Sequence, residues 1–147
     1  FETRGIDSLP QDQFYIKRMV ALGDERVRIG NDRHLRINDE RLDSATPRFE
    51  NVYHFQGPPE KNQYSGHVNE FVARANGRPN LAARFPDEMH EFTVRPNHYL
   101  VMGDNTLNSY DSRAWGDFSR SNVIGKSCFV YWPFSSPTGD RFGWSHR

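Results

Sequence analysis

The feature that most limits the fold of this chain is a series of short apolar segments separated by very short turns. Residues 14–22 (FYIKRMVAL) are rich in aromatic and branched side chains, and residues 26–29 (RVRI) alternate polar and apolar positions. A third apolar segment covers residues 34–37, and the intervening turns at 23–24 and 30–32 carry glycine and aspartate. Strands joined by such short turns pair as antiparallel hairpins, so the sequence predicts a mainly β domain.

The second half of the chain returns to strand-like segments after a long irregular stretch. Residues 92–94, 99–102 and 124–132 are predicted strands, whereas prolines, glycines and charges interrupt residues 44–91, where 69–75 predicts one short helix. We therefore divide the chain into a first part of the β core (1–43), a variable insertion (44–91) and a second part of the core (92–147). Aromatic residues make up 14% of the chain, and we expect several of them in a small core: Phe129, Tyr131, Trp132 and Trp144.

Charge and cysteine content exclude several classes of function. The net charge is +0, so nothing favours a nucleic-acid partner or an anionic membrane surface. The single Cys128 excludes an internal disulfide and a cysteine-based zinc site, and the six histidines lack the spacing of metal ligands. We therefore expect neither a metal nor a cofactor. No window reaches the ~20 consecutive apolar residues of a membrane-spanning helix, and there is no signal peptide.

A dense polar cluster follows the apolar segment 99–102. Within residues 104–113 there are two aspartates, two asparagines, two serines and an arginine, with no helical or strand periodicity. So many hydrogen-bonding groups at the end of a strand predict that they bind and orient a functional side chain elsewhere in the protein. Lys17, which lies within an apolar segment, is the candidate. From the local pattern alone it is either a solvated strand lysine or a desolvated, neutral amine that acts as a general base.

Two blocks carry a resemblance to a known family. The segments YIKRMVAL (15–22) and MGDNTLNSYDSRAWG (102–116) resemble the type I signal peptidases, the bacterial leader peptidase family of Ser/Lys proteases. The hairpin HLRINDERLD and the later NVIGKSCFVYWPF also resemble family segments. The family pattern Gly-Asp-Asn, followed by Ser-x-Asp-Ser-Arg, is met without a gap by seven residues: Gly103, Asp104, Asn105, Ser109, Asp111, Ser112 and Arg113.

The resemblance implies a fold and a set of roles. The fold would be antiparallel sheets of the signal-peptidase type with a barrel-like core. Lys17 would be the catalytic general base, and Ser109 would hydrogen-bond and orient its amine. A free carboxylate beside Lys17 would keep the amine protonated, so the aspartates need to be neutralised by arginines. Accordingly, the resemblance implies two ion pairs, Arg18 with Asp104 and Arg113 with Asp111.

The resemblance also implies a substrate, a location and a missing part. The substrate would be the signal peptide of a preprotein, added as a strand beside Phe14, Tyr15 and Ile16. The catalytic domain would lie on the extracytoplasmic, periplasmic side of the bacterial cytoplasmic membrane, held by a missing N-terminal anchor. In the family the nucleophilic serine lies several tens of residues before the lysine strand. Here only 16 residues precede Lys17, and we interpret Ser8 as part of a loop.

We therefore expect a fragment that is inactive alone and that self-associates along unpaired strand edges. Two positions differ from the family pattern: the stretch ALGDE (21–25) lacks the usual proline, and Thr106 stands where an arginine is usual. Two other hypotheses remain open at this point. One is a non-catalytic β domain that binds an extended peptide. The other is a related Ser/Lys peptidase of the pilin-processing or repressor type.

Overall fold

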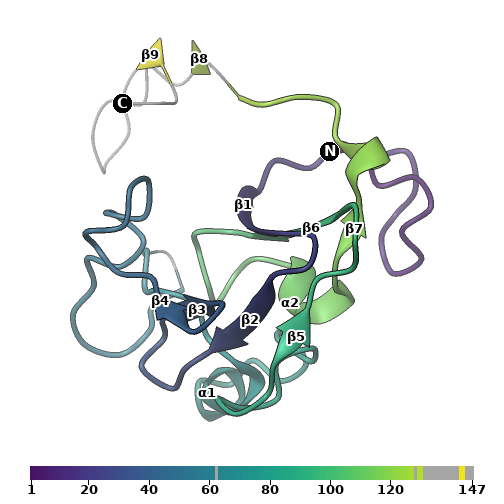
Figure 1. Cartoon of the computed structure of the whole chain (residues 1–147). Coiled ribbons are helices and arrows are strands. Elements are labelled where there is room, and N and C mark those ends of the chain that lie inside the picture. The colour runs from purple at the N-terminus through teal and green to yellow at the C-terminus, as the bar shows by residue number, and fades with distance from the viewer. Residues whose placement is uncertain (62, 128, 131–142, 145–147) are drawn as a thin grey trace.

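The computed structural model of the chain describes residues 1–61, 63–127, 129–130 and 143–144 (Figure 1). Within these residues most regular structure is antiparallel β, with two short α-helices and one 3-10 turn, as the sequence predicts. The elements are β1 (Arg18–Leu22), β2 (Arg26–Ile29), β3 (Leu35–Ile37), β4 (Glu40–Arg41), α1 (Glu70–Ala75), β5 (Phe92–Thr93), β6 (His98–Met102), α2 (Ser112–Trp115), β7 (Phe118–Ser119), η1 (Arg120–Asn122), β8 (Phe129–Val130) and β9 (Gly143–Trp144).

A four-stranded antiparallel sheet has the order β4-β3-β2-β5. The hairpin between β3 and β4 turns at Asn38 and Asp39, whose φ angles of 50° and 71° are both left-handed, as a tight two-residue hairpin requires. Val27 of β2 lies opposite Ile37 on one side and Phe92 on the other. Because β5 pairs with β2, this sheet joins the two halves of the chain.

A three-stranded sheet has the order β1-β6-β7 and carries the segment around Lys17. The predicted first strand, 14–22, is too long: regular pairing begins at Arg18, which lies opposite Met102, the last residue of β6. Strand β6 ends at Met102, so residues before Arg18 have no partner in β6. Phe14 makes only an isolated β-bridge, to Glu2.

The β6 segment is buried on both faces, which explains its unbroken apolar sequence. Leu100 and Met102 pack in the main core with residues of β1, β2 and β3, whereas Val101 packs on the other face with Trp115 and Phe118. Alternate residues of a strand point to opposite faces, so consecutive apolar residues serve two clusters. The position of β6 is thereby fixed from both sides.

Residues 44–91 contribute to the main core although they contain little regular structure. Val52, Tyr53 and Phe85 are buried in the same cluster as Val27 of β2. The predicted helix is confirmed as α1, and Asn69 caps it by accepting a hydrogen bond from the backbone N–H of Val72. The division into 1–43, 44–91 and 92–147 stays a prediction, but the middle segment is packed rather than loosely attached.

The last predicted strand, 124–132, is shorter in the structure. Its described strand portion is β8, which pairs with β9, and residues 124–127 have no strand structure. Tyr131 and Trp132 lie outside the described residues, as do the side chains of Phe129 and Trp144. The sheets of the described residues are open, and none closes into the barrel-like core that the resemblance implied. No described helix has the length and apolar character needed to cross a bilayer.

Candidate active site

The pairing of β1 with β6 brings Lys17 to the beginning of the polar cluster. Arg18 lies opposite Met102, so the residue before Arg18 meets the residue after Met102, where the strand ends. The Nζ atom of Lys17 donates a hydrogen bond to Oγ of Ser109 at 2.8 Å. The structure thus joins the two residues that the sequence predicted to be in contact, from positions 92 residues apart.

Residues 103–113, the support loop, are tied to the end of β6 by two residues at the start of α2. The backbone N–H of Gly103 donates to Oδ2 of Asp111 at 2.9 Å. The backbone N–H of Val101 donates to Oγ of Ser112 at 3.0 Å. Asp111 also caps α2 by accepting from the backbone N–H of Arg113. Both ends of the support loop are therefore bonded to the C-terminal end of β6. Ser109 lies between these two attachment points.

Arg113 and Asp111 form a fully buried ion pair inside the support loop. Both side chains are 0% exposed, and the guanidinium is bidentate, with Nε 2.9 Å from Oδ1 and Nη2 2.8 Å from Oδ2. Burial alone would raise the pKa of the Asp111 carboxyl. The charge and hydrogen bonds of Arg113, together with backbone N–H groups, outweigh burial and hold that pKa below its ordinary value. The pair is therefore ionised and internally neutral.

Burial lowers the pKa of the Lys17 amine below that of an exposed lysine. Desolvation is the main cause; the carboxylate of Asp111 opposes it and the guanidinium of Arg113 adds to it. Since Asp111 is neutralised by Arg113, its effect on Lys17 is partly cancelled. A lysine amine whose pKa is lowered gives up its proton more readily than an exposed one.

Arg18 holds the second carboxylate near the site. Its Nε and Nη2 atoms lie 2.6 Å and 2.7 Å from the two carboxylate oxygens of Asp104, as the sequence predicted for this pair. The hydrogen bond to Asp104 raises the pKa of Arg18. Arg18 also donates to the carbonyl of Arg48 at 2.5 Å and lies 5.2 Å from the ring centre of Phe49. Sequence reasoning missed these two contacts, because nothing in the pattern of residues 44–91 points to β1.

The hydroxyl of Ser109 is enclosed. Ser109 is 5% exposed, and a Cβ atom added at Gly103 would overlap its Oγ and lie 2.6 Å from its Cβ. A carbonyl carbon cannot approach a hydroxyl packed this closely against a backbone. Ser109 can therefore orient the amine of Lys17 but is badly placed to act as a nucleophile itself.

Thr106 is a contact residue of the support loop that sequence reasoning missed. It is 0% exposed, and its Oγ1 accepts from Nη1 of Arg113 at 2.7 Å and from the backbone N–H of Val68 at 2.9 Å. The only signal in the sequence was that a threonine replaces the usual arginine. The structure explains why a threonine suits this position: its hydroxyl accepts two hydrogen bonds, whereas an arginine side chain has no acceptor.

The predicted substrate-binding segment 14–16 presents an open edge. Phe14 and Ile16 are 68% and 88% exposed, and Tyr15 packs its ring against Phe1 at 5.9 Å. The backbone N–H of Tyr15 donates to Phe1, but within the described part of the chain the N–H groups of Phe14 and Ile16 make no hydrogen bond. An extended segment beside Lys17 that bonds to residues 1–3 on one side only is a surface onto which an extended chain could add.

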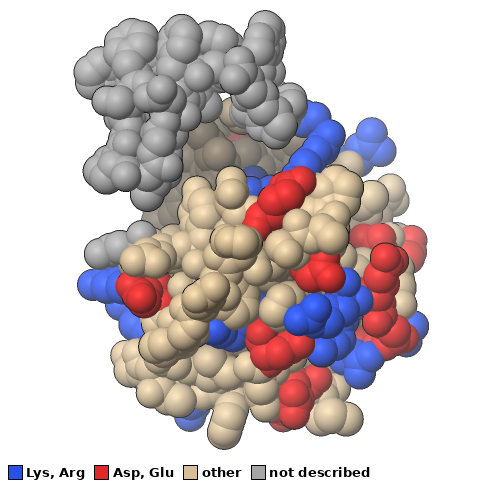
Figure 2. Space-filling view, turned by 90° about the vertical axis from the view of Figure 1, so that its left-hand side faces the viewer, with Lys and Arg blue, Asp and Glu red and all other residues tan. Residues whose placement is uncertain are grey.

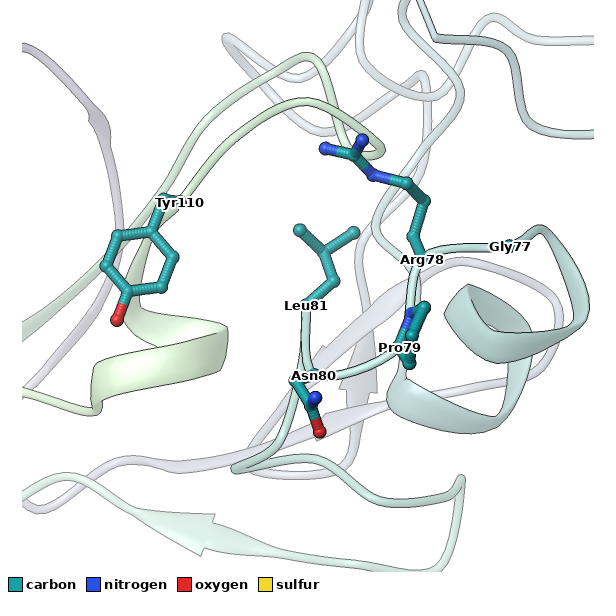
Figure 3. Close-up of a pocket in the computed structure, with 6 residues that line it drawn as sticks. All are labelled: Gly77, Arg78, Pro79, Asn80, Leu81 and Tyr110. Carbon is teal, nitrogen blue, oxygen red and sulfur yellow. The ribbon is translucent and has the colours of Figure 1, made fainter.

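Two hollows lie near the support loop without containing Lys17. Figure 3 shows the smaller, about 290 Å³, where Leu81 lies between Arg78 and Tyr110, the residue directly after Ser109. The larger, about 390 Å³, lies between the loop at residues 5–8 and the β6–β7 strands. Neither of these two hollows is lined by Lys17 or Ser109.

Charged groups are distributed evenly on one side of the molecule (Figure 2), and the described residues include no metal-binding cluster. On the face shown in Figure 2, acidic and basic side chains are interspersed rather than gathered in a field of one sign. Among the described residues, no group of three or more histidine, cysteine, aspartate or glutamate side chains is arranged to hold a metal ion.

Comparison with known proteins gives consistent matches. The family described as "Signal peptidase, peptidase S26" matches residues 5–132. Signal peptidase IB of Staphylococcus aureus is 30% identical over 121 residues, which cover 82% of this chain and 54% of that protein. Signal peptidase I S of Bacillus subtilis is 31% identical over 125 residues, which cover 84% and 55%. The chain therefore spans about half the length of these relatives.

A crystal structure of a signal peptidase I from Enterococcus faecalis aligns with 78% of this chain and 83% of that chain, at 24% identity and a TM-score of 0.44. This similarity is too weak to support conclusions about the site.

Proposed function

This chain belongs to the type I signal peptidases of family S26, and on that premise we propose that Lys17 is the general base of a Ser/Lys protease that removes N-terminal signal peptides from preproteins. The observation that carries the proposal is the hydrogen bond between Lys17 and the enclosed Ser109. Ser109 takes up one side of the amine and leaves the other side for a reacting hydroxyl. The lowered pKa of the amine supports the same role.

Neither Ser109 nor Ser8 is assigned as the nucleophilic serine in this proposal. Ser109 is too enclosed to be attacked by a substrate carbonyl, and Ser8 lies in an exposed loop. In the reaction, neutral Lys17 takes the proton of the serine hydroxyl as its oxygen bonds to the scissile carbonyl carbon. The resulting ammonium gives that proton to the leaving amine, which departs as the new N-terminus of the mature protein. Lys17 then removes a proton from water, which hydrolyses the acyl-enzyme.

The substrate is an extended chain that adds along segment 14–16. The N–H groups of Phe14 and Ile16, which make no hydrogen bond within the described part of the chain, would pair with carbonyls of the preprotein. The exposed side chains of these residues would contact alternate side chains of the substrate. Pairing in this register would deliver the scissile bond next to Lys17, which directly follows the segment.

The complete protein would act at the bacterial cytoplasmic membrane, with this part on the extracytoplasmic side and an anchor supplied by another segment. Secretory preproteins arrive there during export, so the substrate and the catalytic part would meet on the same side.

The test compares two chains in a cleavage assay with a preprotein that carries an Ala-x-Ala site. One chain is residues 1–147, and the other includes the sequence upstream of Phe1. We expect cleavage only by the longer chain, and loss of it on Lys17→Ala but not on the matched Lys126→Ala. Cleavage by the short chain that depends on Lys17 would mean that the nucleophile lies within residues 1–147. No cleavage by either chain would favour the non-catalytic, peptide-binding alternative.

A further inference from the structure

We propose that Thr106 is a positioning residue for the general base: its hydroxyl links Arg113 to the backbone of residues 67–69 and so fixes the support loop against Lys17. The inference deepens the proposed function and rests on it. Thr106 is not part of the Lys17–Ser109 contact or of the two ion pairs, and the resemblance assigns it no role. The positioning role is inferred from its own contacts.

The Thr106 hydroxyl joins two donors that would otherwise be buried without a partner. Oγ1 accepts from Nη1 of Arg113 at 2.7 Å and from the backbone N–H of Val68 at 2.9 Å. All three residues are 0% exposed. A hydroxyl oxygen has two acceptor lone pairs, and both are used here. Because all three residues are fully buried, loss of this oxygen would leave a cationic N–H and a backbone N–H without this acceptor.

Arg113 transmits this constraint to Lys17. Its Nε and Nη2 atoms donate to the two carboxylate oxygens of Asp111, and Nη2 also lies 3.4 Å from the carbonyl of Ser109. Ser109 in turn accepts from Lys17. Thr106 therefore binds the third nitrogen of the guanidinium, Nη1, while the other two hold Asp111 and the carbonyl of Ser109. A guanidinium that lost its partner at Nη1 would move towards another acceptor and disturb those contacts.

The other end of the link is a rigid part of the core. His67 is fully buried and its Nδ1 lies 2.9 Å from the hydroxyl of Tyr53. On the other side of Val68, Asn69 donates to the carbonyl of Ile29 at 3.1 Å and caps α1. Residues 67–69 are therefore held from both sides, and Thr106 connects the support loop to this fixed segment rather than to another loop.

The neutral hydroxyl also preserves the charge balance around the amine. The titratable and charged groups that face Lys17 are Asp111 and Arg113 from the support loop, the Arg18–Asp104 pair beside them, and Tyr15, whose ring centre lies 5.9 Å from Nζ. Asp111 raises the pKa of Lys17 and Arg113 lowers it. If Arg113 moves away, the carboxylate is less compensated, and the Lys17 amine becomes harder to deprotonate. Thr106 thus supports the neutral form of the base without contributing charge.

The experiment measures the titration of Lys17 directly. The chain has three lysines, Lys17, Lys61 and Lys126, so the side-chain ε-carbon signals of ¹³C-lysine-labelled protein can be assigned with one Lys17→Met variant. We compare Thr106→Val, which keeps the shape and removes the hydroxyl, with Thr106→Ser, which keeps the hydroxyl. Thr106→Val should raise the Lys17 midpoint by about half a pH unit or more, and Thr106→Ser should leave it near that of the unchanged chain.

The outcomes separate this inference from the proposed function. A Lys17 midpoint that stays low in Thr106→Val, even with a lower melting temperature, would mean that Thr106 is merely structural and would overturn the inference. If Thr106→Val does not fold, the same criterion applies to Thr106→Ala. A Lys17 midpoint no lower than those of Lys61 and Lys126 in the unchanged chain would instead overturn the assignment of the base. In the longer, active chain, Thr106→Val should shift the acidic limb of the kcat/KM profile upward by the same amount, and Thr106→Ser should restore it.

Discussion

The amine of Lys17 and the hydroxyl of Ser109 lie 2.8 Å apart, although one residue directly precedes β1 and the other lies seven residues beyond the end of β6. The antiparallel register of these two strands makes the contact possible, because it places the start of one next to the end of the other. The support loop then folds back so that Ser109 approaches the glycine at position 103. The direction of the Lys17 amine is therefore determined by the register of β1 and β6, by Gly103 and by the buried Asp111–Arg113 pair.

The first prediction concerns this contact. In the longer, active chain, Ser109→Ala should lower kcat by about 100-fold and change KM little, because the amine loses the partner that orients it towards the nucleophile. Steady-state cleavage of a preprotein measures both constants. Ser121→Ala, on the exposed η1 turn, is the control. An unchanged kcat in Ser109→Ala would show that Lys17 does not need this hydroxyl.

The second prediction concerns the Asp111–Arg113 pair. Asp111→Asn or Arg113→Ala should each lower the free energy of unfolding by roughly 3–5 kcal/mol, because each leaves a charged partner uncompensated in a fully buried site. The double variant should be less destabilised than the sum of the two. Thermal and urea unfolding of the four proteins measure the coupling. Strict additivity would mean that the two side chains do not stabilise each other.

An exposed pair provides the contrast. Arg4 and Asp12 are 3.0 Å apart but both side chains are 70% exposed. Removing either should leave the melting temperature almost unchanged, since solvent and salt screen such pairs. A loss comparable to that of Asp111→Asn would show that the chain responds to charge changes in general rather than to burial.

The third prediction concerns Gly103. Its backbone is not in the left-handed region, so alanine would test only the added methyl group. That methyl would overlap Ser109, so Gly103→Ala should cost about 1–3 kcal/mol and displace the hydroxyl from Lys17. Melting temperature and the Lys17 titration both report the change. Gly125→Ala, where an added Cβ meets nothing within 4 Å, should leave both unchanged.

Most of the strands could be predicted because their pattern is local. Residues 26–29 alternate, and the hairpin turns carry the residues that left-handed backbone angles favour, so β2, β3 and their pairing follow from short-range chemistry. The start of β1 could not be predicted in this way. Residues 14–17 look like a strand, but whether they pair depends on where β6 ends, which is a tertiary property.

The site was predicted in part for the same reason. Lys17, Ser109 and both ion pairs follow from two sequence blocks whose resemblance to a family fixes their relationship. Thr106, Arg48 and Phe49 could not be found, because their contacts cross from residues 44–91 to the support loop or to β1. A stretch without periodicity gives no indication of which of its residues face the core. His67 is another example: its spacing excluded a metal site, but nothing indicated that it is completely buried.

The fourth prediction follows from that burial. Burial, with the nearby charge of Arg113 adding to it, lowers the pKa of His67 from 6.5 to about 3. Between these values the unfolded chain binds a proton at this residue and the folded chain does not, so stability rises with pH. The contribution of neutral His67 to the free energy of unfolding is therefore complete above pH 6.5 and is lost progressively as the pH falls towards 3. This loss is roughly 4–5 kcal/mol if no other group intervenes.

Replacing His67 by glutamine removes this titration and keeps a hydrogen-bonding group opposite Tyr53. The free energy of unfolding of His67→Gln should therefore fall less steeply than that of the unchanged chain between pH 6.5 and pH 4, whatever its value at pH 7. Urea unfolding at several pH values measures the slope. His54→Gln, at an exposed position, should keep the steep slope. Equal slopes in His67→Gln and the unchanged chain would mean that His67 binds its proton at the same pH in the folded and the unfolded chain, and would contradict the lowered pKa.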